Sequence, residues 1–118
     1  MIQRNKPLQP AKQRAVRRCL LVASAEVTEL HSGTRLSGRT SEIGLGGCYV
    51  DSLNPFPEGT LVGLRILRDQ GVFEAKAKVV YCHPRFGMGL AFTEMTNDQR
   101  SLLESWLADL VTKLRPTS

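Results

Sequence analysis

Three arginines near the N-terminus have the residue type and spacing to bind an anion. Arg14, Arg17 and Arg18 fall within five positions, and residues 1–18 hold six basic side chains and no acidic one. A guanidinium is always charged, and its planar fork of N–H groups matches a phosphate or the O6/N7 edge of guanine. Taken by itself, such a cluster is more often a solvated charge run, and the alternative interpretation is a binding site for an anionic ligand.

A second segment with binding chemistry is EIGLGG at residues 42–47, which contains Glu42, Gly44 and Gly47. A carboxylate accepts hydrogen bonds from N–H donors, and a glycine lets a ligand approach the backbone closely. The segment lacks the lysine and the following helix of a P-loop, so a β-bulge is the alternative interpretation of its glycines.

Catalytic and metal-binding patterns are missing from the sequence. Cys19, Cys48 and Cys82 are an odd number, lie far apart and form no CxxC pair, and Cys82-His83 has no partner at metal spacing. No Ser–His–Asp, HExxH or Walker arrangement is present. We therefore predict a binding module that is not an enzyme and has no metal or cofactor, with the cysteines as buried or half-buried thiols.

The positive net charge of +5 comes from the N-terminal segment, because the remaining ten basic and eleven acidic side chains leave the rest of the chain at about −1. A nucleic-acid-binding barrel would need basic and aromatic residues interleaved on its surface, but aromatic residues make up only 6% of the 118 residues. We therefore do not expect nucleic acid as a partner. No apolar run is long enough to span a bilayer and the first residues lack a secretory signal, which favours one compact cytoplasmic domain.

Period-two patterns and turn residues predict a mainly β chain with six short strands. The cleanest pattern runs from Phe73 to Tyr81, where apolar residues alternate with charged ones. Short strands joined by tight turns predict an antiparallel sheet or a closed barrel. The expected strands are residues 19–30, 34–41, 48–51, 60–67, 73–81 and 86–92.

The pattern changes to helical spacing after Met95. Thr96 and Gln99 have the form of a capping box, in which Thr96 is the N-cap and Gln99 reaches back to it. Apolar residues then recur every three or four positions, which predicts a helix that packs over one end or side of the barrel, with a partner's surface as the alternative. This stripe consists of Leu103, Trp106, Leu107, Leu110, Val111 and Leu114.

The order of these elements and three local motifs resemble the PilZ domain, a bacterial six-stranded β-barrel with a C-terminal α-helix. Arg14 to Arg18 are similar to the family's RxxxR motif, and residues 42–47 are similar to its [D/N]xSxxG motif between strands two and three. The run Gly87–Phe92 resembles its last strand. The domain organisation is then a basic flexible arm at residues 1–18, a barrel at 19–95 and a helix packed on the barrel at 96–115.

The best-known PilZ domains bind cyclic di-GMP, so the resemblance implies a receptor that relays the level of this second messenger to an unknown protein partner. Cyclic di-GMP is a dianion with two guanines, and arginines on an arm could fold onto the barrel when it arrives. Tyr49, Phe73, Tyr81 and Trp106 are expected in the core, with contact between an outward Tyr49 and a purine as the alternative. The expected ligand-binding residues are Arg14, Arg17, Arg18, Glu42, Gly44 and Gly47.

Two positions depart from the family's second motif. Glu42 stands where the family has Asp or Asn, and Gly44 stands where it has Ser, which removes a hydroxyl. Loss of one such hydrogen bond to a charged group costs about 1.5–3 kcal/mol, or roughly ten- to a hundred-fold in affinity. The alternative function is therefore a degenerate PilZ domain that does not bind nucleotide and acts as a protein-interaction module. A register shifted to Arg39–Gly44 recovers the serine but displaces the strand that follows.

Overall fold

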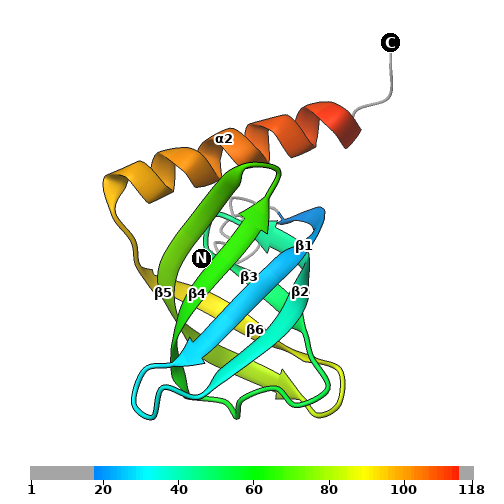
Figure 1. Ribbon diagram of the computed structural model, residues 1–118. Coiled ribbons are helices and arrows are strands. Elements are labelled where there is room, and N and C mark those ends of the chain that lie inside the picture. The colour runs from blue at the N-terminus through cyan, green and yellow to red at the C-terminus, as the bar shows by residue number, and fades with distance from the viewer. Residues whose placement is uncertain (1–17, 115–118) are drawn as a thin grey trace, which may run out of the picture.

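The computed structural model describes residues 18–114, with side chains to residue 111, as a six-stranded antiparallel barrel and one C-terminal helix (Figure 1). The predicted fold class is confirmed. Strand β1 begins at Arg18, the last residue of the predicted arm, and the rest of that arm lies outside the described residues. The elements are β1 (Arg18–Glu29), β2 (Arg35–Gly44), β3 (Gly47–Asp51), β4 (Leu61–Arg68), β5 (Gly71–His83), β6 (Gly87–Glu94) and α2 (Asn97–Leu114).

The barrel consists of two meanders that meet at two seams. Strands β1, β2 and β3 form one meander, strands β4, β5 and β6 form the other, and the order around the closed barrel is β1-β2-β3-β6-β5-β4. The β1–β4 seam pairs Ser24–Glu29 with Leu67–Val62, and the β3–β6 seam pairs Gly47–Asp51 with Ala91–Gly87. Closure leaves no complete strand edge open to another chain.

Inward-facing residues of all six strands fill the barrel. Alternate side chains along each strand point inward, and Val27, Ile66 and Phe73 among them have no solvent-exposed surface. Thr40 is the one buried polar side chain among the described residues. Its Oγ1 donates to the Leu21 carbonyl at 2.8 Å, where a bulge leaves that residue without a partner on β2.

Strands β2, β5 and β6 extend past their predicted ends, and β2 and β5 do so through or up to residues that signal turns. Strand β2 continues past Ser41 to Gly44, and β5 continues past Tyr81 to His83. The glycine run after Ser41 and the proline after His83 are turn signals, but Gly44 pairs with Arg18 and His83 pairs with Gly87. The predicted boundaries are wrong here because a ladder partner keeps a glycine or a polar residue extended.

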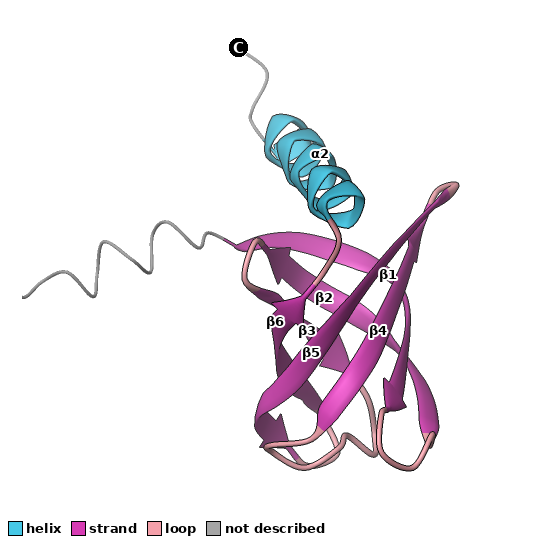
Figure 2. Cartoon of the chain, turned by 90° about the vertical axis from the view of Figure 1, so that its left-hand side faces the viewer, coloured by secondary structure: helices cyan, strands magenta, loops and turns pink. Residues whose placement is uncertain are grey.

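Helix α2 lies across one end of the barrel (Figure 2). Its apolar stripe buries Leu103, Trp106 and Leu110, as the spacing predicts. The Trp106 ring packs against Phe73 with centroids 6.1 Å apart, and the Arg68 guanidinium lies 5.6 Å from the centroid of its ring. No helix among residues 18–114 has the length and apolar content needed to cross a membrane.

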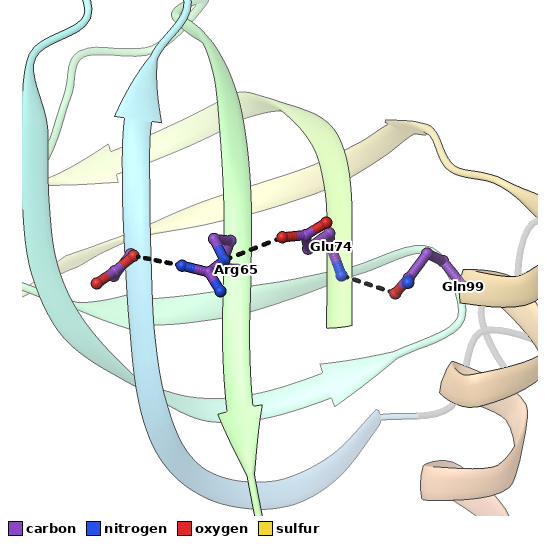
Figure 3. A network of polar contacts seen from close by, with 4 residues as sticks. Arg65, Glu74 and Gln99 are labelled. Atoms are coloured by element: carbon purple, nitrogen blue, oxygen red, sulfur yellow. Dashed lines mark hydrogen bonds and ion pairs between the residues drawn. The ribbon is translucent and has the colours of Figure 1, made fainter. Parts of the chain in front are cut away.

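The start of α2 differs from the predicted capping box. The Gln99 amide N–H donates to Thr96 Oγ1 at 3.2 Å, which confirms Thr96 as the N-cap. The Gln99 side chain does not reach back to Thr96; its Oε1 accepts from the Glu74 amide of β5 at 2.8 Å (Figure 3). The ladder with β6 begins only at Lys76, so Gln99 satisfies a strand amide that lies beyond the last pair.

The same region carries an ion-pair chain across three strands. Arg65 on β4 contacts Glu26 on β1 at 3.3 Å and Glu74 on β5 at 3.0 Å (Figure 3). These side chains are about half exposed, so each pair contributes at most about 1 kcal/mol to stability. The three side chains link β1, β4 and β5 on the outer surface of the barrel.

The helix is expected to depend on Trp106. Trp106→Ala should lower the free energy of unfolding by about 3–5 kcal/mol, because it leaves a cavity against Phe73 and removes the contact with Arg68. Urea unfolding followed by circular dichroism measures this, with Glu104→Ala on the exposed face of α2 as the control that stays within about 0.5 kcal/mol. Equal stability of the two variants would contradict the packing described above.

Candidate functional site

Arg18 and Glu42 form an ion pair on the outer surface of the barrel. Arg18 is the first residue of β1 and pairs with Gly44, while Glu42 pairs with Leu20 on the same face. Arg18 Nη1 lies 3.2 Å from Glu42 Oε1, and the two side chains are 34% and 47% exposed. A half-exposed pair of this kind adds little to stability. Because the pair uses one contact and both groups are partly exposed, each retains hydrogen-bonding capacity for a ligand.

The other two predicted arginines, Arg14 and Arg17, lie outside the described residues. The structure therefore brings together Arg18, Glu42 and Gly44 of the predicted site, with Gly47 three residues further along. A role of Arg14 and Arg17 in binding stays a prediction.

Gly44 and Gly47 flank the tight turn between β2 and β3. Leu45 and Gly46 form this turn, and the Gly46 carbonyl accepts from the Phe92 amide of β6 at 2.8 Å. A Cβ atom on Gly47 would collide with the Leu90 carbonyl oxygen of β6. Gly47 is thus required where β3 and β6 approach closely, which is a structural role and does not depend on a ligand.

Three aromatic rings gather on the outer surface next to this pair. The ring of Tyr49 on β3 lies 6.1 Å from that of Tyr81 and 5.9 Å from that of His83, both on β5. The Tyr49 hydroxyl is 3.0 Å from His83 Nδ1. Glycines at positions 87 and 89 of β6 make room for the rings, because a Cβ at Gly87 would collide with Tyr49 and one at Gly89 with Tyr81.

This cluster corrects the prediction that Tyr49 and Tyr81 belong to the core, whereas the prediction for Phe73 and Trp106 is confirmed. Strand β5 has a bulge between Val79 and Tyr81, so the alternation that keeps Phe73 inward changes phase and Tyr81 turns outward, 38% exposed. Gly87 and Gly89 on β6 are the sequence signal for rings that face outward. This signal can be interpreted only when the register of β6 with β3 and β5 is known.

The ion pair and the rings belong to one row of neighbours across the barrel. Leu20, Glu42, Tyr49, Gly89 and Tyr81 are successive cross-strand partners on β1, β2, β3, β6 and β5. Directly opposed residues have Cα atoms about 4.5–5.5 Å apart, so Tyr49 borders the Glu42 carboxylate. Together with Arg18, which is bonded to Glu42, the row presents a cation, an acceptor and aromatic faces on one surface.

The ionisation of Tyr49 fits this description. Burial, followed by the nearby Asp51, Tyr81 and Cys82, raises the pKa of Tyr49 above its ordinary value. A phenol is already protonated at neutral pH, and the raised pKa keeps the Tyr49 hydroxyl uncharged there.

The cysteines take no part in the site. Cys19 and Cys48 are buried and Cys82 is half-buried, as predicted, and all three are free thiols. Burial raises the pKa of Cys48 to about 12, against an opposing effect of Arg18, so its thiol is unreactive at neutral pH. No group of three or more His, Cys, Asp or Glu residues that could hold a metal occurs within residues 18–114.

Comparison with known proteins places these residues in a family context. The PilZ domain family matches residues 11–109, while no curated protein matches the chain. The fold is similar to the PilZ domain with c-di-GMP of YcgR from Escherichia coli, with a TM-score of 0.70 and 17% identity over 87% of this chain and 95% of that chain.

Two further solved structures share the fold. One is the PilZ domain of CeSA from a cellulose synthesizing bacterium, with a TM-score of 0.64 and 18% identity over 80% of this chain and 98% of that chain. The other is the inhibitor of motility MotI/DgrA from Bacillus subtilis, with a TM-score of 0.66 and 21% identity over 97% of this chain but 55% of that chain.

The structural role of Gly47 leads to a stability test. Gly47→Ala should cost about 1–3 kcal/mol or more, because the new methyl group forces β3 away from the Leu90 carbonyl. Gly63→Ala on β4 is the matched control, since its Cβ would lie 3.5 Å from Leu30 Cδ2 in ordinary contact. The control should be neutral or stabilised by up to about 1 kcal/mol. Similar thermal unfolding of both variants would show that the β3–β6 approach tolerates a side chain.

Proposed function

The chain belongs to the PilZ domain family, and we propose that it is a receptor for cyclic di-GMP that passes the level of this second messenger to a protein partner. The observation that carries the proposal is the Arg18–Glu42 pair on the outer surface, at 3.2 Å. These are the residues that match the last arginine of the family's first motif and the acidic position of its second. They lie 24 positions apart in sequence and are brought together by the β1–β2 ladder.

The pair has the chemistry that a guanine nucleotide needs. The Glu42 carboxylate accepts hydrogen bonds from the N1–H and N2–H groups of one guanine, which are both donors. Arg18 donates to a phosphate or to the O6/N7 edge, and a guanidinium does this in two parallel bonds where a lysine cannot. The carboxylate is one methylene longer than the aspartate of the family motif, so the base lies correspondingly further from β2.

The remaining contacts come from the N-terminal arm and from the ring of Tyr49. Arg14 and Arg17 precede β1 directly and supply the further positive charge that a dianion requires. Tyr49 borders Glu42 in the ladder, and its ring offers a face for the second purine or for the ribose. The arm would close over a ligand held between these groups.

We propose binding and relay, and no catalysis, as the role of the domain. The polar groups on this outer surface are the Arg18–Glu42 ion pair, the protonated phenol of Tyr49 and the His83 imidazole bonded to that phenol. Such groups suit recognition of a ligand. A cyclic di-GMP receptor acts where this messenger is made, so the proposal includes a cytoplasmic location. In this proposal the relay runs from the domain to a protein partner.

Calorimetric titration of the full chain with cyclic di-GMP tests the receptor role. We expect micromolar or tighter binding that Arg18→Ala weakens at least about tenfold, because the variant removes a charge-assisted contact and leaves Glu42 unpaired beside the phosphates. Arg14→Ala should weaken binding similarly. Arg35→Ala is the control, since Arg35 is an exposed arginine at the far end of β2, and it should change the affinity less than about twofold.

Two results would contradict the receptor role. One is a lack of heat at about millimolar ligand with the chain folded by circular dichroism, which would favour a domain that has lost nucleotide binding. The other is an equal loss of affinity in the Arg18 and Arg35 variants, which would show only a general effect of charge.

Gly44 offers a gain-of-function test of the same site. Gly44 is the last residue of β2, next to the ion pair, at the position where the family motif has serine. Gly44→Ser should tighten binding of cyclic di-GMP by about tenfold or more, because it restores a hydroxyl donor to phosphate. Gly44→Ala is the control that adds a Cβ without the hydroxyl. If serine and alanine change the affinity equally, the hydroxyl has no place in the site and the motif register is wrong.

A further inference from the structure

Two arginines line a shallow pocket on the barrel, one outward-facing row of cross-strand pairs beyond the two tyrosine rings of the site described above. The pocket holds about 420 Å³ between the middle of β2, the end of β3 and the β5–β6 turn. Arg39 comes from β2 and Arg85 from the turn, which lies at the end of the barrel opposite α2 (Figure 1). Asp51, Leu53 and Phe86 line the same pocket.

These arginines form no ion pair, in contrast to three others. Arg18, Arg65 and Arg68 each form an ion pair with a carboxylate. Arg39 and Arg85 are exposed and form no ion pair with any residue of the described range 18–114. Arg35 on β2 and Arg100 on α2 also form none within residues 18–114, but they lie outside the pocket.

Arg39 is left unpaired although a carboxylate is its neighbour. It is the cross-strand partner of Asp51, but the Asp51 carboxylate accepts from the Ser41 hydroxyl at 3.4 Å. The pocket therefore has two cations free to bind carboxylates of another molecule, and one acceptor in its wall.

The turn that carries Arg85 is held in a strained conformation. Arg85 has a φ of 72°, which is unfavourable for a residue with a side chain. The Phe86 amide donates to the His83 carbonyl at 2.9 Å, and the Ser52 amide donates to the Phe86 carbonyl at 3.0 Å. These bonds fix the turn so that Arg85 and Phe86 are both presented to solvent.

Two large apolar side chains flank the arginines. Phe86 is 73% exposed and Leu53 is 76% exposed. Exposed aromatic and arginine side chains around one pocket are the composition of protein–protein contact sites, where such residues supply most of the binding energy. Neither side chain contributes to the barrel core, so the fold itself does not account for them.

We propose that this pocket docks a protein segment that is acidic and carries a large apolar side chain. Carboxylates of the segment bond to Arg39 and Arg85, and its apolar side chain covers Phe86 and Leu53. Asp51 accepts a backbone N–H of the segment. The pocket gives the receptor a place for a partner, but the inference does not rest on nucleotide binding, because Arg18 and Glu42 take no part in it.

The charge pattern favours a protein segment over a membrane or a nucleic acid. Attraction to an anionic bilayer takes a cluster of about four to eight basic residues, and polyanion binding takes several phosphate contacts. This pocket has two arginines, and the Asp51 carboxylate between them repels a continuous polyanion. A short segment can place carboxylates on the arginines and a backbone amide on the aspartate.

Selection of random twelve-residue peptides on phage against the full chain tests the proposal. We expect enriched peptides with Asp or Glu next to Phe, Trp or Leu. In ¹⁵N-resolved NMR spectra, the corresponding synthetic peptide should shift the amides of Arg39 and Phe86 with and without cyclic di-GMP. Selected peptides that lack acidic residues, or an absence of any selected peptide, would overturn it.

Variants of the pocket give the quantitative arm of the test. Arg39→Glu/Arg85→Glu should weaken the selected peptide at least about tenfold, whereas Arg35→Glu/Arg100→Glu, with the same change of charge outside the pocket, should stay within about twofold. Arg85→Gly is a second variant that relieves the positive φ, so it keeps the fold and should still weaken binding. Equal binding by both double variants, or arginine-dependent binding to phosphatidylserine vesicles in place of the peptide, would overturn the proposal.

Discussion

The close approach of β3 and β6 is the constraint on which the rest of the molecule depends. The two meanders meet there by pairing strands that are far apart in sequence, and Gly47 makes this pairing possible because a side chain would strike the Leu90 carbonyl. The bond from the Phe92 amide to the Gly46 carbonyl then fixes the turn beyond Glu42. The glycines of this seam act as packing surfaces and hold the β2–β3 turn against β6, while the β1–β2 ladder places the Arg18–Glu42 pair next to that turn.

The same seam explains why the outer surface is polar and aromatic where the inside is aliphatic. Gly87 and Gly89 have no side chains to cover the outside of β6, so Tyr49 and Tyr81 lean over that strand from both sides. The packing of the core is kept, because the bulge after Val79 turns only the end of β5, with Tyr81, outward. Phe73 stays inside and packs against Trp106. One extra residue in β5 thus separates a ring that supports the helix from a ring that is available to a ligand.

The sequence was sufficient to predict the strands, the helix and the barrel, because alternation and capping are local signals. It also placed Arg18 and Glu42 in one site through a family resemblance. It could not predict that Tyr49 and Tyr81 face outward, since bulges change the phase of alternation and depend on partner strands. Nor could it predict that Gln99 bonds to Glu74, because a capping pattern carries no information about an unpaired amide on another strand.

The distribution of arginine partners connects fold and function. Arg65 and Arg68 bond to carboxylates on other elements, and Arg68 also contacts Trp106, so these side chains hold strands and helix together. Arg18 is paired with Glu42, the other residue of the proposed site, so the proposed nucleotide would compete for that contact. Arg39 and Arg85 neither link elements of the fold nor belong to the proposed nucleotide site. The strained turn that holds Arg85 nevertheless costs free energy. This turn presents Arg85 beside Arg39 and Phe86 around one pocket, which is the arrangement that the proposed acidic segment would bind.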